Sequence, residues 1–179
     1  MERSVIIAGF GGQGVILAGK ILAQAGMNHD LEVTWLPSYG PEMRGGTANC
    51  TVVLSDEPVG SPIVDEPTAV VALNRPSLDK FEPIIAAGGA VIVNASLIER
   101  QVTRDDIDAH YVRVNDIALE AGSARAINMV ALGAYLKATG IVPLEIVQST
   151  MAQMLEESGK AKFVPLNEQA LERGYDSVD

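Results

Sequence analysis

The chain has 179 residues, 47% of them hydrophobic but only 4% aromatic, and a formal net charge of -10. This length suits one domain with its own core, and the acidic balance argues against nucleic acid as a partner, because its phosphates need clustered Lys and Arg. The single cysteine, Cys50, excludes an intrachain disulfide framework and a cysteine-ligated zinc or iron–sulfur site held by this chain alone.

The apolar segments are typical of a soluble, cytoplasmic protein with no membrane partner. Residues 1–4 lead straight into a strand pattern, and no signal peptide is expected there. The longest uncharged run lies between Glu82 and Glu99 and is interrupted by glycines and by Asn94. We therefore interpret it as a helix end, a turn and a buried strand, and not as a membrane span.

The first predicted elements are a strand over residues 4–8, a glycine turn, and a helix from Gln13 to about His29. The turn, residues 9–14, reads G-F-G-G-Q-G and matches the G-x-G-x-x-G spacing of phosphate-binding turns. Glycine allows a sharp turn and a close approach to a ligand, and the N-terminus of a helix attracts anions. The turn is thus a candidate anion or cofactor site, and a tight turn without a ligand is an equally good interpretation.

A second strand is predicted over residues 32–36, ending at Pro37, and a distinctive loop follows it. The loop, residues 37–46, contains two prolines and three glycines and exceeds the usual connection of about two to six residues. Arg44 could clamp a carboxylate or phosphate with its planar guanidinium, or pair with Glu42 or a neighbouring subunit. Tyr39 could stack on a ligand or simply pack the loop.

The sequence argues against a dinucleotide cofactor such as NAD. Rossmann units place an acidic residue about 20 residues beyond the glycines, at the end of the second strand, to bind the ribose. Residues 36–38 occupy that position here and read Leu-Pro-Ser. Neither an acid nor an arginine for a 2′-phosphate stands there.

The remaining elements alternate between strands and helices. Strands are predicted over residues 47–55, 67–73, 90–94 and 110–114. Helices are predicted from Asn74 or Ser77 to Gly88 and over residues 126–139, 143–158 and 167–173, the last capped by Asn167, while residues 163–165 are expected to be extended. This alternation predicts an α/β fold: a Rossmann-like three-layer sandwich, residues 1–179 in one domain, with a mostly parallel sheet. Because no helix precedes residues 47–55, the sheet should include an antiparallel strand or hairpin.

No self-contained catalytic or metal-binding group is evident. His29 and His110 are far apart and lack the spacing of metal ligands. Cys50 lies on an alternating strand and is expected in the core, not as a nucleophile. No metal site is predicted, and Arg44 is the one catalytic candidate.

Three motifs in this order and spacing resemble the gamma subunit of the 2-oxoacid:ferredoxin oxidoreductases. They are the glycine turn with Val15, the S-Y-G-P-E-M-R-G-G segment at residues 38–46, and N-M-V-A-L-G-A at residues 128–134. Residues 167–175 also look like that family's last helix. The resemblance runs from about Ser4 to Tyr175, and its second motif is the most specific.

The resemblance implies a division of labour among subunits. The family oxidises pyruvate, 2-oxoglutarate or branched 2-oxoacids to acyl-CoA, using thiamine diphosphate, Mg²⁺, iron–sulfur clusters, ferredoxin and coenzyme A. Sibling alpha and beta subunits would hold the thiamine and the clusters. The complex could also include a ferredoxin-like delta subunit. This chain would bind no cofactor alone and would contribute to coenzyme A access and subunit assembly. A 2-oxoglutarate or branched-chain substrate is favoured over pyruvate.

By similarity, the residues expected to face the shared site come from all three motifs. They are Gly9, Gly11, Gly12, Gln13, Gly14, Tyr39, Glu42, Arg44, Gly45, Gly46 and Asn128. Two alternatives stay open: a free-standing nucleotide-binding or regulatory module, and a purely structural docking subunit. The sequence also leaves room for a homodimer of the isolated chain.

Overall fold

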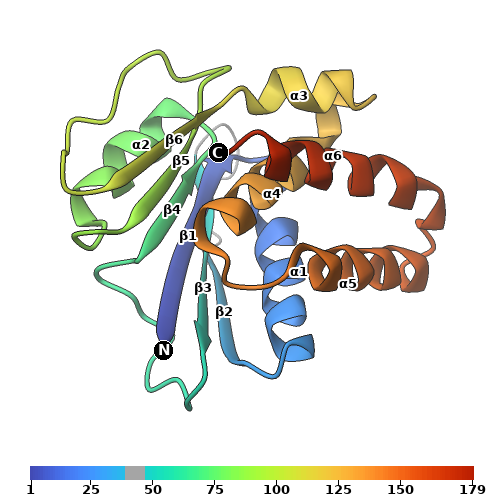
Figure 1. The fold of residues 1–179 in the computed structure, drawn as a ribbon, viewed down its shortest axis with the longest axis horizontal. Helices are drawn as coiled ribbons and strands as arrows, with labels where there is room; N and C mark the ends of the chain where they lie inside the picture. The colour runs from blue at the N-terminus through green and yellow to red at the C-terminus, as the bar shows by residue number, and fades with distance from the viewer. Residues whose placement is uncertain (39–46) are drawn as a thin grey trace.

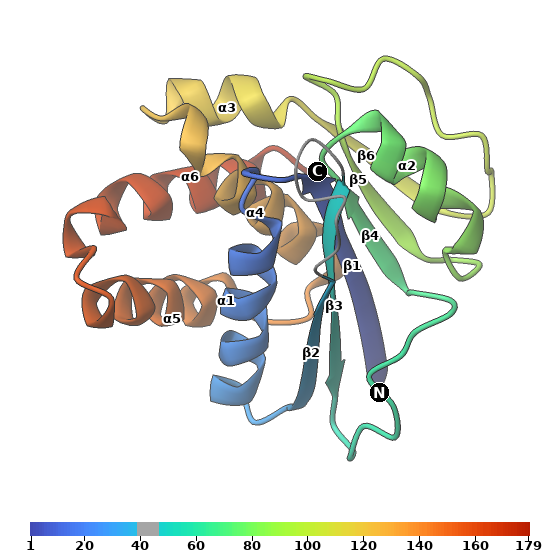
Figure 2. The same cartoon turned by 180° about the vertical axis from the view of Figure 1, so that it is seen from behind.

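The computed structural model describes residues 1–38 and 47–179, which form one sheet covered by helices on both faces (Figures 1 and 2). The strands are β1 (Glu2–Phe10), β2 (Glu32–Ser38), β3 (Thr47–Ser55), β4 (Ala69–Ala72), β5 (Ala90–Asn94) and β6 (Asp108–Val112). The α-helices are α1 (Val15–Asn28), α2 (Arg75–Phe81), α3 (Val114–Glu120), α4 (Ile127–Thr139), α5 (Leu144–Glu157) and α6 (Val164–Asp176). The predicted α/β sandwich is confirmed.

The strands are ordered β2-β3-β1-β4-β5-β6. Strand β3 is antiparallel to both β1 and β2, whereas β1, β4, β5 and β6 are parallel to one another. The expectation of a mostly parallel sheet with an antiparallel strand is therefore confirmed. The register pairs Phe10 with Thr47, so β3 begins beside the glycine turn.

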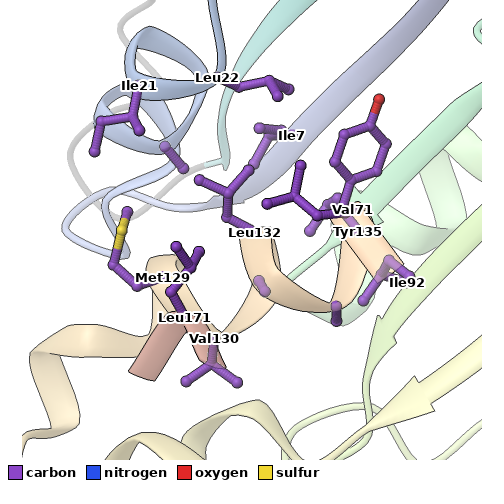
Figure 3. Packing of buried hydrophobic residues seen from close by; sticks show 14 of the residues in the cluster. Ile7, Ile21, Leu22, Val71, Ile92, Met129, Val130, Leu132, Tyr135 and Leu171 are labelled. Atoms are coloured by element: carbon purple, nitrogen blue, oxygen red, sulfur yellow. The ribbon is translucent and has the colours of Figure 1, made fainter. Parts of the chain in front are cut away.

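Successive residues of β1 point to opposite faces of the sheet, as the pleat requires. Val5 and Ile7 face the larger core beneath α1 and α4, whereas Ile6 and Ala8 face the smaller core beneath α2. Figure 3 shows the larger core, where Leu132 and Tyr135 of α4 point toward the sheet residues Ile7, Val71 and Ile92. Helices α5 and α6 lie outside α1 and α4 on the same face (Figure 1).

Small residues let α1 approach β2 and β3 closely. A Cβ at Gly19 would clash with the Sγ of Cys50, and one at Gly26 would clash with the side chain of Leu54. The helix is therefore seated directly on the antiparallel part of the sheet, and this close seating fixes where its N-terminus lies.

The helix predicted to run to Gly88 is shorter than expected. Asn74 is its N-cap, accepting a 2.9 Å hydrogen bond from the N–H of Ser77. The α-helix ends at Phe81, and a 3₁₀ turn follows over Glu82–Ile84. Pro83 explains the early end, because proline has no N–H to donate and its ring obstructs the preceding turn.

The prediction of a strand over residues 110–114 missed α3. The strand is β6, which ends at Val112, and α3 begins at Val114. The hydroxyl of Ser96 accepts hydrogen bonds from the N–H groups of Asn115 (3.1 Å) and Asp116 (3.4 Å). A local sequence pattern cannot reveal a cap that comes from so far along the chain.

The C-terminal prediction was also wrong in detail. Residues 163–165 are not extended: Pro165 lies in the first turn of α6, where its fixed φ is favourable. Asn167 is inside the helix and not at its cap, since its Nδ2 donates to the carbonyl of Phe163 at 2.8 Å.

Strand β2 was predicted to end at Pro37 but continues through it to Ser38. Because β2 is an edge strand, it tolerates a residue that has no N–H to donate.

Candidate functional site

The glycine turn connects β1 to α1 at the carboxyl end of β1. Gly12 and Gly14 have φ angles of +91° and +75°, in the left-handed region that favours glycine. The side chain of Gln13 closes the turn by accepting a 2.6 Å hydrogen bond from the N–H of Phe10. Gly9 serves packing, because a Cβ there would lie 3.0 Å from the Cβ of Leu73.

Asn128 joins the first and third motifs. Its Nδ2 donates to the carbonyl of Gly14 at 3.2 Å, although the two residues are 114 positions apart. Asn128 is only 6% exposed, and a Cβ on Gly14 would lie 2.6 Å from its Nδ2. The structure therefore brings together Gly9, Gly11, Gly12, Gln13, Gly14 and Asn128, and their role in a shared site stays a prediction.

Cys50 supports the same helix end from the sheet side. Its Sγ contacts the carbonyl of Val15 at 3.3 Å, as a donor. Burial raises the pKa of the thiol to about 12, so the reactive thiolate is suppressed at neutral pH. Cys50 is thus a core residue, as expected, and together with Asn128 it fixes the first turn of α1.

The N-terminus of α1 differs from those of the other helices that directly follow a described strand. Asn74 caps α2 and Ser96 caps α3, whereas α1 begins at Gly14 without a side-chain cap from any described residue. The first turn of α1 also contains no acidic residue. The first N–H groups and the positive end of the helix dipole are consequently suited to an anion.

A groove of about 500 Å³ runs beside this helix end, and its walls include residues that the sequence reasoning did not select. Phe10, Leu17, Lys20 and Trp35 line it together with Gly11, Gly12 and Gly14. Phe10 and Leu17 are 41% and 42% exposed. Phe10 and Leu17 lie within and just after the glycine turn in the sequence, and this closeness could have identified them as site residues. Among the described residues, the groove offers apolar contact and the cation of Lys20 next to the start of α1.

Five of the predicted site residues, Tyr39, Glu42, Arg44, Gly45 and Gly46, lie outside the described residues. The flanking residues are described: Ser38 pairs with Asn49 and Thr47 pairs with Phe10. Ser38 and Thr47, which flank the segment, therefore lie at the same end of the sheet as the glycine turn, where β1 ends.

The topology gives an independent reason why a dinucleotide does not fit. In a dinucleotide-binding unit the second strand lies next to the first. Here β3 separates β2 from β1, which puts β2 roughly 9–10 Å from β1. The end of β2 is thus displaced from the ribose position, in addition to lacking an acidic residue.

Neither a cluster of metal ligands nor a membrane-spanning helix is found in the described part of the chain. Within residues 1–38 and 47–179, no three His, Cys, Asp or Glu side chains gather as a metal site would require. The helices of these residues are too short or too polar to span a bilayer.

Comparison with known proteins gives a consistent set of relatives. A family model described as pyruvate ferredoxin/flavodoxin oxidoreductase matches residues 4–177. The 2-oxoglutarate synthase subunit KorC of Methanocaldococcus jannaschii is 34% identical over 179 residues, covering 98% of this chain and 94% of that protein. The ketoisovalerate oxidoreductase subunit VorA of Methanothermobacter marburgensis is 42% identical over 98% of this chain. The chain spans only 36% of the length of that VorA.

A solved structure agrees with these sequence relatives. The gamma subunit of a keto/oxoacid ferredoxin oxidoreductase from Geobacter sulfurreducens superimposes with a TM-score of 0.83 at 29% identity. The alignment covers 98% of this chain and 97% of that one.

Proposed function

The chain belongs to the pyruvate ferredoxin/flavodoxin oxidoreductase family, and on that premise we propose that it is the gamma subunit of a 2-oxoacid:ferredoxin oxidoreductase. The complex would oxidatively decarboxylate a 2-oxoacid to acyl-CoA. Residues 1–179 would act as one gamma-type domain within a cytoplasmic assembly. This chain would supply part of the coenzyme A path and of the subunit contacts, and it would not be catalytic alone.

The full-length similarity to KorC carries this proposal, because it covers nearly all of both chains. The longer VorA includes a similar segment within a chain of almost three times the length, which supports a role for this fold beside other functional units. A 2-oxoglutarate or branched-chain substrate agrees with the names of these two relatives.

The cofactors of the reaction would belong largely to sibling subunits. Iron–sulfur clusters need several thiolates, and the chain has one buried cysteine with a raised pKa. Thiamine diphosphate, Mg²⁺ and the clusters would accordingly lie in alpha, beta or delta subunits, with ferredoxin as the electron acceptor.

Coenzyme A is the group that suits the glycine-turn region of this chain. Its phosphates are anionic, and the region offers the N-terminus of α1, the cation of Lys20 and a position at Gly12 where an added Cβ would touch no described residue within 4 Å. Gln13 and Asn128 would keep this surface in place. We assign Tyr39, Glu42, Arg44, Gly45 and Gly46 to the same surface on sequence grounds, with Arg44 binding a carboxylate or phosphate.

Co-purification tests the subunit assignment. The tagged chain, expressed with the genes encoded beside it, should retain a thiamine-binding subunit and an iron–sulfur subunit through gel filtration. Recovery of the chain alone, as a monomer or homodimer, when those proteins are present and folded would contradict the assignment.

Steady-state kinetics of the assembled complex tests the coenzyme A contact. Lys20→Ala and Arg44→Ala should each raise the KM for coenzyme A by about three- to tenfold, because each removes one cation from the anion site. The KM for the 2-oxoacid should stay the same, and Arg75→Ala on α2 is the matched control. Poor assembly, with a normal KM for coenzyme A in the complexes that form, would instead favour a docking subunit.

A further inference from the structure

A second hollow, separate from the glycine turn, lies between α1, α4, α5 and the start of α6 and has a volume of about 380 Å³. Its floor is apolar and buried, formed by Ile21, Met129 and Met151, which are at most 1% exposed, and by Leu155, which is 9% exposed. Ile21 and Met129 project from α1 and α4, as Figure 3 shows. This volume is within the range of about 300–1,000 Å³ that small-molecule pockets occupy.

The mouth of this pocket is apolar as well. Leu17 of α1 and Phe163, just before α6, line it and are each 42% exposed. Flexible thioethers and aliphatic side chains adapt their shape to an irregular apolar ligand. The pocket is therefore suited to an aliphatic chain.

The charge around the pocket contrasts with that of the whole chain. The protein carries a net charge of -10, yet no described lining residue is acidic, and Arg125 and Lys160 both line the pocket. Neither cation forms an ion pair with a described residue. An anionic group held by an aliphatic chain in the pocket would meet both.

The neighbouring polar groups favour a carboxylate over a phosphate. Phosphate sites usually add several main-chain N–H donors. Here the N–H of Arg125 already donates to the hydroxyl of Ser123 at 3.1 Å, and Asn167 donates to the carbonyl of Phe163. Two side-chain cations remain, which matches the two oxygens of a carboxylate.

We propose that this pocket binds an aliphatic monocarboxylate, with the chain on the floor formed by Ile21, Met129, Met151 and Leu155 and the carboxylate between Arg125 and Lys160. The inference does not rest on the proposed subunit role. It assigns a ligand to a pocket whose border meets the glycine turn: Leu17 lines both hollows, and Asn128, which lines this pocket, donates to the carbonyl of Gly14.

Octanoate is a suitable probe, and the full chain labelled with ¹³C-methyl methionine is a suitable reporter. Titration should shift the methyl signals of Met129 and Met151, which line the pocket, and leave Met27, which is 56% exposed elsewhere on α1, unchanged. Octan-1-ol should bind more weakly, because it lacks the charge, and octylammonium should bind least.

Charge reversal provides the decisive variant. Arg125→Glu with Lys160→Glu changes two exposed side chains and should weaken octanoate binding by about tenfold or more, consistent with the loss of two charge contacts. The same variant should bind octylammonium more tightly. Arg75→Glu with Lys80→Glu on α2 is the control and should leave octanoate binding unchanged.

Three results would overturn the proposal: no shift of Met129 and Met151 with octanoate, equal binding of octanoate and octan-1-ol, or octanoate binding that survives the reversal at Arg125 and Lys160. None of these results bears on co-purification with sibling subunits, so the two proposals fail independently.

Discussion

The N-termini of α1, α2 and α3 follow strands of the same sheet, but they are completed differently. Asn74 caps α2, and the distant hydroxyl of Ser96 caps α3. The start of α1 has no side-chain cap from a described residue, and exposed Phe10 and Leu17 lie beside it. The contrast indicates that the first N–H groups of α2 and α3 are paired with side chains of the chain itself, whereas the start of α1 leaves N–H donors beside an exposed apolar surface.

In the α2–α3 region, residues 74–116, the irregular segment between β5 and β6 is held to the end of α2 by hydrogen bonds and ion pairs. One oxygen of Glu82 accepts hydrogen bonds from the N–H (2.6 Å) and hydroxyl (2.8 Å) of Thr103, and the other pairs with Arg100 at 2.7 Å. Arg104 donates to the carbonyl of Ile85 at 2.5 Å. We call these residues the Glu82 cluster; it connects the segment between β5 and β6 to the end of α2.

The largest effect is expected from breaking the Glu82 cluster. Glu82 is 3% exposed, so Glu82→Ala should lower the free energy of unfolding by about 3 kcal/mol, because it leaves Arg100 and Thr103 without their buried partner. Urea unfolding measures this loss. Asp79→Ala, which removes the half-exposed partner of Arg100, is the control and should cost under about 1 kcal/mol. Equal costs would show that the buried carboxylate has no special role.

A smaller loss is expected at the glycine turn. Gly14→Ala should cost about 1–2 kcal/mol, since it puts a side chain in the left-handed region and against Asn128. Gly12→Ala is the matched control, because Gly12 has a similar φ but an added Cβ there would meet no described residue within 4 Å. If the two variants unfold at the same urea concentration, the contact with Asn128 does not constrain the turn.

The stability that Glu82 contributes should be lost in acid and kept at neutral pH. Burial of Glu82 opposes ionisation, but hydrogen bonds from Thr103 and the pair with Arg100 outweigh it and hold the pKa below its usual range. The unfolded state therefore binds more protons, and the stabilisation, present above the ordinary carboxyl pKa, is lost as pH falls through the lowered one. Asp56 and Asp106 also have lowered pKa values, so the pH slope should be compared with that of Glu82→Gln. Identical slopes would argue against this role of Glu82.

The smallest effect on stability, but a clear effect on assembly, is expected at Leu17. Because Leu17 is 42% exposed, Leu17→Ser should change the free energy of unfolding by less than about 0.5 kcal/mol. It should nevertheless reduce recovery of the sibling subunits in co-purification. Leu119→Ser, at a 67% exposed position on α3, should affect neither. Equal recovery with both variants would place the partner surface elsewhere.

Local sequence patterns were sufficient for much of the fold. The bounds of β3 and β5 follow from apolar runs with turn residues at each end, and Gly140 ends α4 in the left-handed conformation expected of a C-cap. The glycine turn and its helix were likewise predictable. These elements depend on residues that are close together in the sequence.

The features that sequence reasoning missed depend on residues that are far apart. The start of α3 depends on Ser96, and the position of the glycine turn depends on Asn128 through a contact that spans 114 residues. Motif resemblance selected Asn128, but only the fold shows that it donates to Gly14. The pocket residues Arg125 and Lys160 come from separate turns, so no spacing rule connects them.

Reconstitution of the enzyme tests the central claim most directly. The sibling subunits would be prepared without this chain, and acyl-CoA formation from a 2-oxoacid, with coenzyme A and ferredoxin supplied, would be measured before and after its addition. We predict that activity requires the added chain, that it saturates at a fixed stoichiometry, and that the chain alone is inactive. Full activity of the sibling subunits without this chain would contradict the account.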